Sequence, residues 1–170
     1  IGGLGIFIIL SYAAGQLTQA IGNALESIWW RVWGGFPTDW VRIGKGDLLA
    51  KPQIIAIEEQ LLQKLELQGP ISLKDISSTD WLSITRQMYV AISAYSRSGR
   101  IDMFNGNYGL NRGIAAAFLI LALLTVIHNW IIALLLFIGS LIAIYRMYRY
   151  GRYYAREIFI EFLQLPIPKT

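Results

Sequence analysis

Four arginines and four tyrosines occupy the eleven residues RMYRYGRYYAR, numbers 146–156, directly after the most apolar part of the chain. The arginines are spaced by three, three and four residues, so a helix presents them as one basic stripe. They are Arg146, Arg149, Arg152 and Arg156. Basic residues and tyrosines at the end of an apolar helix are typical of a headgroup anchor on the cytoplasmic side. The forked guanidinium also suits an anionic lipid, a nucleotide or an acidic partner helix.

A second group of residues that could have a chemical role is a polar stripe near the N-terminus. It consists of Gln16, Gln19, Asn23 and Ser27, which recur at helical spacing within an otherwise apolar segment. Such side chains are unfavourable against lipid. They can bond to neighbouring helices, or line a water-filled path if several copies assemble. We favour packing between helices over a pore.

Other residues give no pattern of a catalytic or metal site. Glu26 is the one acid of the N-terminal segment and can reach water or Arg31, and His128 is the one histidine. No HExxH, GxxxxGK[ST] or GxSxG motif is present. The absence of cysteine excludes disulfides, thiolate metal sites and cysteine nucleophiles. We therefore predict a protein that is not an enzyme and has no metal and no cofactor.

The composition indicates the class of protein in which these residues occur. The chain has 170 residues, of which 55% are hydrophobic and 15% charged, and its mean hydropathy is +0.46. Soluble domains have about 25% charged residues. Residues 113–144 contain no Asp, Glu, Lys or Arg at all. This pattern predicts an all-α integral membrane protein with three transmembrane helices.

The first predicted element is a long helix over residues 1–33. At 1.5 Å per residue it extends about 50 Å, which exceeds the roughly 30 Å hydrocarbon core. We expect it to tilt or to project from the bilayer. An aromatic belt anchors it at the interface. The belt consists of Trp29, Trp30, Trp33 and Trp40. Gly34, Gly35 and Pro37 end the helix.

Residues 34–107 form a predicted cytoplasmic helical region. One helix begins near Pro52 and ends at Gly69-Pro70, with Ile57 and Leu61 on its apolar face. A second begins near Ser78 or Thr79 as N-cap. Its apolar side consists of Trp81, Ile84, Met88, Ile92 and Tyr95. The glycines and asparagines of FNGNYGLNRG, residues 104–113, predict a kink at the membrane interface.

A transmembrane hairpin is predicted over residues 108–149. As one straight helix, residues 113–144 would extend about 48 Å, which is too long for a single span. The only polar interruption is His128-Asn129, and Arg112 and Arg146 each lie 17 residues from Asn129. A turn there brings both arginines to the same depth, where they contact lipid headgroups.

Residues 150–170 form a predicted basic, amphipathic helix and tail. Ile158, Phe159, Phe162 and Leu163 share an apolar face, so this helix packs on residues 52–100 or on another protein. All fifteen Lys and Arg residues lie outside 113–144. By the positive-inside rule, residues 34–112 and the C-terminus are cytoplasmic in a multi-pass protein of a cell (inner or plasma) membrane.

These features favour a non-catalytic subunit or scaffold of a membrane-associated assembly, docking partners through its cytoplasmic helices. The expected partners are anionic lipid headgroups and either other subunits or copies of the chain in a homo-oligomer. No nucleic-acid binding is predicted. The alternative is an oligomeric effector that perturbs the membrane or forms a pore.

Overall fold

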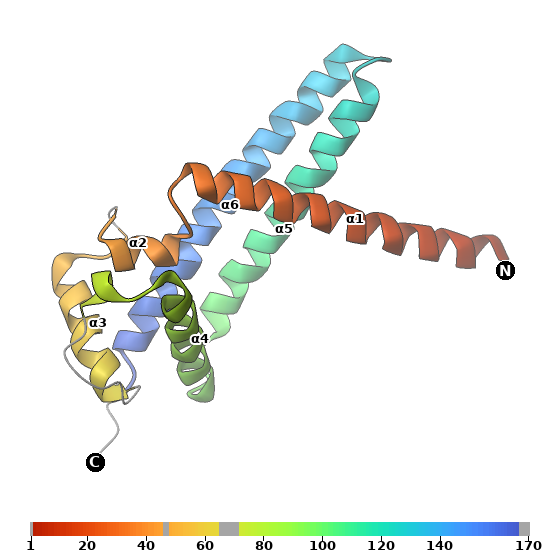
Figure 1. Ribbon diagram of the computed structural model, residues 1–170. Coiled ribbons are helices and arrows are strands. Elements are labelled where there is room, and N and C mark those ends of the chain that lie inside the picture. The colour runs from red at the N-terminus through yellow and green to blue at the C-terminus, as the bar shows by residue number, and fades with distance from the viewer. Residues whose placement is uncertain (1, 46–47, 65–71, 167–170) are drawn as a thin grey trace. The chain divides into compact units, whose positions relative to one another are not determined.

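A computed structural model describes residues 2–45, 48–64 and 72–166, and every regular element in these ranges is helical (Figure 1). The elements are α1 (Gly2–Val32), α2 (Pro37–Ile43), α3 (Lys51–Lys64), the 3₁₀ turn η1 (Leu73–Asp75), α4 (Ser78–Ala94), α5 (Gly99–Thr125) and α6 (Trp130–Leu163). The all-α prediction is confirmed. The elements α1, α5 and α6 contain the three segments that are long and apolar enough to cross a membrane.

The chain divides into two compact units. The hairpin unit consists of Ile1–Trp33 and Gly106–Arg149, and the core unit consists of Gly34–Asn105 and Tyr150–Thr170. Both α5 and α6 contribute residues to each unit. The two units are described separately below.

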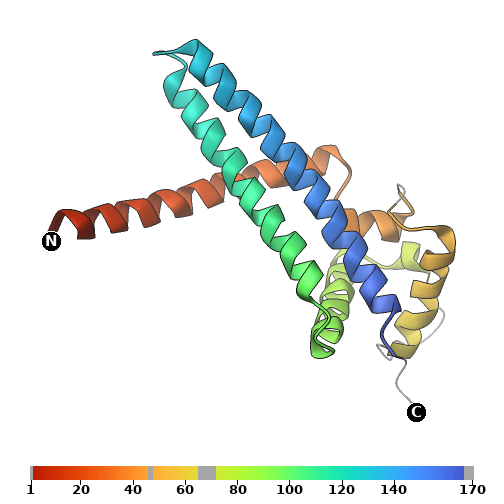
Figure 2. The same ribbon diagram turned by 180° about the vertical axis from the view of Figure 1, so that it is seen from behind.

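In the hairpin unit, α5 and α6 form the predicted hairpin, with His128 and Asn129 in its turn (Figure 2). The Asn129 Oδ1 caps α6 by accepting from the backbone N–H groups of Ile131 and Ile132, both at 3.1 Å. Further along the pair, the Ser140 hydroxyl donates to the carbonyl of Ala115 at 2.8 Å. The capped turn and the hydrogen bond between α5 and α6 therefore favour this register of the two helices.

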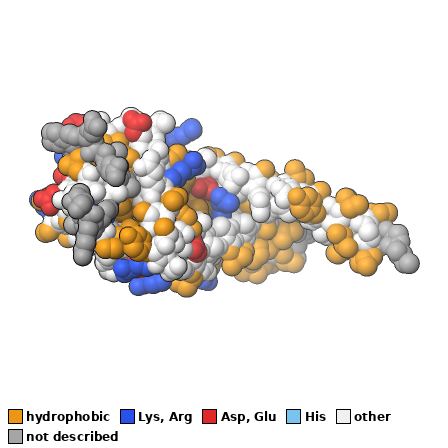
Figure 3. Space-filling model, turned by 90° about the horizontal axis from the view of Figure 1, so that it is seen from below, with side chains coloured by type: hydrophobic (Ala, Val, Ile, Leu, Met, Phe, Trp, Pro, Cys, Tyr) orange, Lys and Arg blue, Asp and Glu red, His pale blue; other side chains and the backbone are white. Residues whose placement is uncertain are grey.

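The helix α1 crosses this hairpin through its C-terminal half. A Cβ on Gly22 would lie 3.2 Å from the Cγ of Arg112 and 3.7 Å from the Cβ of Ala116, so α1 and α5 approach closely there. Residues 3–17 are all exposed and lead away from the hairpin (Figures 1 and 2). On the face seen in Figure 3, this N-terminal arm carries hydrophobic and uncharged side chains only.

The core unit folds around side chains from α3, α4 and the ends of α5 and α6. The predicted apolar faces account for most of this core, because Ile57, Leu61, Trp81, Ile84, Met88 and Ile92 are all buried with Ile158, Phe159 and Phe162. The indole of Trp81 stacks on Phe159 with ring centroids 5.8 Å apart. The C-terminal helix thus packs on the 52–100 region, which was one of the two predicted outcomes.

Polar contacts at the edge of this core tie helices to one another. Glu157 and Glu161 of α6 form ion pairs with Arg100 at 3.0 Å and with Arg97 at 2.8 Å. The Tyr89 hydroxyl donates to Asp102 at 2.6 Å. That hydrogen bond raises the pKa of the Tyr89 phenol, because the bond favours its protonated form.

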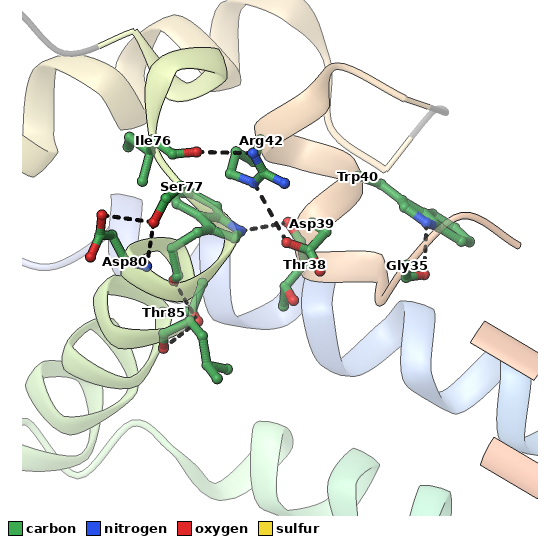
Figure 4. Close-up of polar contacts among 11 residues, drawn as sticks. Gly35, Thr38, Asp39, Trp40, Arg42, Ile76, Ser77, Asp80 and Thr85 are labelled. Atoms are coloured by element: carbon green, nitrogen blue, oxygen red, sulfur yellow. Dashed lines mark hydrogen bonds and ion pairs between the residues drawn. The ribbon is translucent and has the colours of Figure 1, made fainter. Parts of the chain in front are cut away.

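The short helix α2 is held to α4 and the turn before it by its polar groups (Figure 4). The Trp81 indole donates to the carbonyl of Thr38 at 2.9 Å, and Arg42 donates to the carbonyl of Ile76 at 2.9 Å. Before α2, Gly34 and Gly35 have φ of 79° and 101°, which a residue with a side chain rarely adopts. The predicted stop after residue 33 is therefore confirmed.

Three local expectations differ from the structure, and a fourth falls on residues that it does not describe. The N-cap of α4 is Ser77, which accepts from the Asp80 N–H, one residue before the predicted position. The helix α5 runs unbroken through residues 104–113, so the glycines and asparagines do not interrupt it. Tyr95 is exposed because it follows the last turn of α4. The predicted end of α3 at Gly69-Pro70 lies outside the described residues.

Candidate functional site: a charged and aromatic cluster at the helix crossing

Charged and aromatic side chains of the hairpin unit meet where α1 crosses α5 and α6. We refer to them as the crossing cluster. Its members are Glu26, Trp29 and Trp30 of α1, Trp33 directly after α1, Tyr108 and Arg112 of α5, and Tyr148 of α6. Helical spacing places Glu26, Trp29 and Trp30 on one side of α1.

An ion pair joins α1 to α5 in this cluster. The guanidinium Nη1 of Arg112 donates to the Oε2 of Glu26. The Glu26 residue is 9% exposed, whereas the Arg112 side chain is 27% exposed. A carboxylate at this depth needs a partner, because removing a charge from water is costly. The absence of a side chain at Gly22 lets the two helices come close enough for the pair.

A hydrogen bond lies beside the ion pair. The Trp30 indole N–H donates to the Tyr108 hydroxyl at 2.7 Å. The same hydroxyl lies near the Glu26 carboxylate. An indole can only donate, so the Tyr108 oxygen is the acceptor of this bond.

Aromatic rings join α6 to the segment around the end of α1. Tyr148 lies between three indoles, with ring centroids 5.7 Å from Trp30, 5.2 Å from Trp33 and 6.3 Å from Trp29. Such offset and edge contacts add about 0.5–1.5 kcal/mol per pair beyond burial. The Trp29 indole N–H is buried and has no hydrogen-bond partner among the described residues. The cluster therefore clamps three helices together mainly through ring contacts.

Most polar groups of the crossing cluster are engaged with one another. Its acid is neutralised by an arginine, and its phenol bonds to an indole and lies beside that acid. Within the described ranges, no group of three or more His, Asp or Glu residues is placed to hold a metal ion. An arrangement of this kind fixes the crossing of the helices and keeps a charged pair out of lipid.

The predicted basic stripe is distributed along the second half of α6. Arg146 and Arg149 are exposed in the hairpin unit, whereas Arg152 is half-buried and Arg156 exposed in the core unit. Arg112 was predicted to contact headgroups with this stripe. Its guanidinium pairs with Glu26 within the protein, and the headgroup contact stays a prediction.

The polar stripe of α1 lies on the surface of the hairpin unit. Gln16, Gln19, Asn23 and Ser27 are all exposed. They lie beside the side of α1 that packs on the hairpin, so the hairpin does not cover them.

The four predicted interface tryptophans have different surroundings. Trp33 is 42% exposed and Trp29 is half-buried, and both contact Tyr148. Trp30 is 2% exposed and Trp40 is 6% exposed. The Trp40 indole donates to the carbonyl of Gly35 at 3.0 Å, within the core unit. Some of these tryptophans therefore pack inside a unit, and others contribute to its surface.

Sequence reasoning missed the pairing of Glu26 with Arg112. The available signal was that each is the one charged residue of its neighbourhood, Glu26 in the first 30 residues and Arg112 next to the apolar run. Two opposite charges in apolar helices favour a mutual contact. The pair is separated by 86 residues, so local periodicity gives no indication of it.

Comparison with protein families, with curated proteins and with solved structures finds no match to this chain.

Proposed function

We propose that this chain is a non-catalytic integral membrane subunit or scaffold, which holds partner proteins of a larger assembly at the membrane. Three long apolar helices support the membrane location. The polar groups of the crossing cluster support the absence of catalysis, because each bonded group is used in holding helices together. The core unit supplies the surface for partners.

The observation that carries the docking proposal is an apolar stripe on the outer side of α4. Leu82 is 53% exposed and Val90 is 65% exposed, and the exposed Arg86 lies between them. Steps of four residues align these side chains on the side away from Trp81 and Met88. Apolar side chains that a unit leaves outside its own core favour a protein contact.

The first test is the composition of the complex in native membranes. The chain would be extracted in mild detergent through a C-terminal tag, and each co-purifying protein identified and quantified. We expect different proteins in fixed ratio to the tagged chain. Recovery of the tagged chain alone would contradict the subunit proposal.

A matched pair of variants then tests the surface. Leu82→Glu and Gln63→Glu each add one negative charge at an exposed helical position, on α4 and α3 respectively. We expect Leu82→Glu to lose the partner proteins while the thermal stability of the chain is kept. Gln63→Glu is expected to retain them. Equal retention by both variants would exclude α4 as the docking surface.

We further propose that the protein resides in a cell membrane, inner or plasma, with residues 34–112 and the C-terminus on the cytoplasmic side. The distribution of Lys and Arg supports this orientation. The exposed arginines of α6 are then placed to contact anionic headgroups.

The exposed polar stripe of α1 favours a second candidate function, an oligomeric effector that permeabilises the membrane. In that case expression alone collapses the membrane potential. Replacing Gln19 and Asn23 by Leu would abolish the effect without loss of insertion. Unchanged toxicity of this double variant would contradict the pore.

A further inference from the structure

We propose that residues 9–23 of α1 pair, in parallel and in register, with the same segment of a second copy of this chain. The contact is a narrow seam of amide side chains. The seam consists of Ile9, Tyr12, Gln16, Gln19 and Asn23. Its members follow one another at steps of three, four, three and four residues, which is the spacing that keeps one side of a helix against a partner helix.

The seam has no cover within its own chain. All five residues are exposed, and Tyr12 is 70% exposed. Among the described residues, the side chains of Gln16, Gln19 and Asn23 make no hydrogen bond. By contrast, the nearby Thr18 hydroxyl donates to the carbonyl of Ala14 at 2.8 Å. The hairpin does not cover the seam: Ile9, Tyr12 and Gln16 lie on the arm that leads away from it (Figures 1 and 2), and Gln19 and Asn23 are exposed.

The depth of the amides makes a cover necessary. If α1 spans the bilayer with Trp29 and Trp33 at the interface, Gln16 and Gln19 lie about 15–25 Å further along the helix. A spanning α1 then holds them inside a hydrocarbon core that is roughly 30 Å thick. Lipid chains offer no hydrogen-bond partner, so amides exposed there are strongly unfavourable. A protein surface with its own donors and acceptors satisfies them.

The symmetry of a membrane favours a second copy as that surface. Copies inserted with the same orientation are related by an axis perpendicular to the bilayer, so their α1 helices run parallel and each seam residue faces its own counterpart. An amide both donates and accepts, so Gln16 can bond to Gln16 of the second copy. Charged residues would repel their counterparts, and residues 2–25 contain none.

A glycine extends the seam toward the N-terminus. Gly5 lies seven residues before Tyr12, and a Cβ at Gly5 would have no atom within 4 Å. Two helices can therefore approach closely at that level. Close approach, together with Ile9 and Tyr12 in the same seam, favours a dry contact in which amides bond to amides. A water-filled path between the copies is then absent.

This pairing goes beyond the proposed function and does not rest on it. The seam lies on α1, whereas the proposed docking of other proteins uses α4 of the core unit. Either can fail without the other.

Cysteine cross-linking of the full-length chain in native membranes tests the seam directly, because the chain has no cysteine of its own. Single variants Tyr12→Cys, Gln16→Cys, Gln19→Cys and Asn23→Cys are oxidised with copper phenanthroline. We expect disulfide-linked dimers at all four positions. Leu10→Cys, Leu17→Cys and Ala24→Cys lie outside the seam, each one residue after a seam position, and serve as controls. We expect several-fold less dimer from each of them.

Three results of this scan would overturn the proposal. They are equal cross-linking at seam and control positions, no dimer at any seam position, and disulfides from the seam to a different protein. Rapid labelling of Gln19→Cys by a charged, water-soluble thiol reagent would also overturn it, because a dry seam excludes that reagent. Labelling of His128→Cys in the exposed turn provides the reference rate.

A second measurement does not depend on cysteine. The variant Gln16→Leu/Gln19→Leu is more apolar and should insert and fold, yet it lacks two amide pairs. We expect its dimer association constant in lipid vesicles, measured by single-molecule photobleaching, to fall about tenfold. The control Leu10→Val/Leu17→Val changes residues outside the seam and should leave the constant unchanged. An unchanged constant in the glutamine variant would contradict the seam.

Discussion

At the scale of single residues, the buried ion pair of Glu26 and Arg112 governs how the apolar helices meet. Two charges removed from water gain little net stability as a pair, because the cost of desolvation offsets their attraction. One charge left alone is far less favourable. The pair therefore selects one packing of α1: this helix is stable on the hairpin only where the carboxylate meets the guanidinium.

This argument predicts the effect of removing the acid. Glu26→Gln leaves the Arg112 charge without its counterion, so we expect a loss of about 2–4 kcal/mol in the unfolding free energy. The lower part of the usual range applies because the Arg112 side chain is 27% exposed. Denaturant titration of the chain in mild detergent would measure the loss.

The design includes two comparisons. Arg31→Gln removes an exposed charge from the same helix, and we expect a change within about 0.5 kcal/mol. The double variant Glu26→Gln/Arg112→Gln has no buried charge and should recover part of the loss, which a double-mutant cycle quantifies. If Glu26→Gln lost as little stability as Arg31→Gln, the ion pair would not determine how α1 packs on the hairpin.

At the scale of elements, close approach of α5 and α6 depends on a residue without a side chain. A Cβ on Gly139 would lie 2.7 Å from the Cδ2 of Phe118, which is too near for two carbon atoms. We therefore expect Gly139→Ala to destabilise the hairpin unit by about 1–3 kcal/mol. The control is Gly113→Ala, because a Cβ there meets nothing within 4 Å.

Thermal unfolding of both variants in the same detergent would separate the two cases. Replacement of a helical Gly by Ala otherwise favours the helix, so Gly113→Ala is expected to be neutral or slightly stabilising. Equal behaviour of the two alanine variants would mean that Phe118 moves aside without cost.

The elements were largely predictable from the sequence because their signals are local. The hairpin follows from one polar interruption in an apolar run, and the faces of α3 and α4 follow from their spacing. The continuity of α5 was not predicted, because packing around Asn111 and Tyr108, both buried, outweighs the low helix propensity of residues 104–113. The crossing cluster joins distant segments, so it required the three-dimensional structure.

At the scale of the whole molecule, the arrangement in the membrane is the prediction with the widest consequence. Every proposal for the core unit requires that it face the cytoplasm, while the turn between α5 and α6 lies outside. The turn carries no Lys or Arg, and the positive-inside rule depends on that contrast. Single cysteines in this cysteine-free chain can report both sides.

The structure indicates which positions to label. His128 is exposed in the turn, whereas Asn129 caps α6 and should be left intact. Gln63 is exposed on α3. In intact cells a membrane-impermeant thiol reagent is expected to label His128→Cys at once, and Gln63→Cys only after the membrane is permeabilised. Labelling of both from the same side would refute the hairpin as a pair of spanning helices, because one crossing along α5 and one along α6 place the turn and the core on opposite faces.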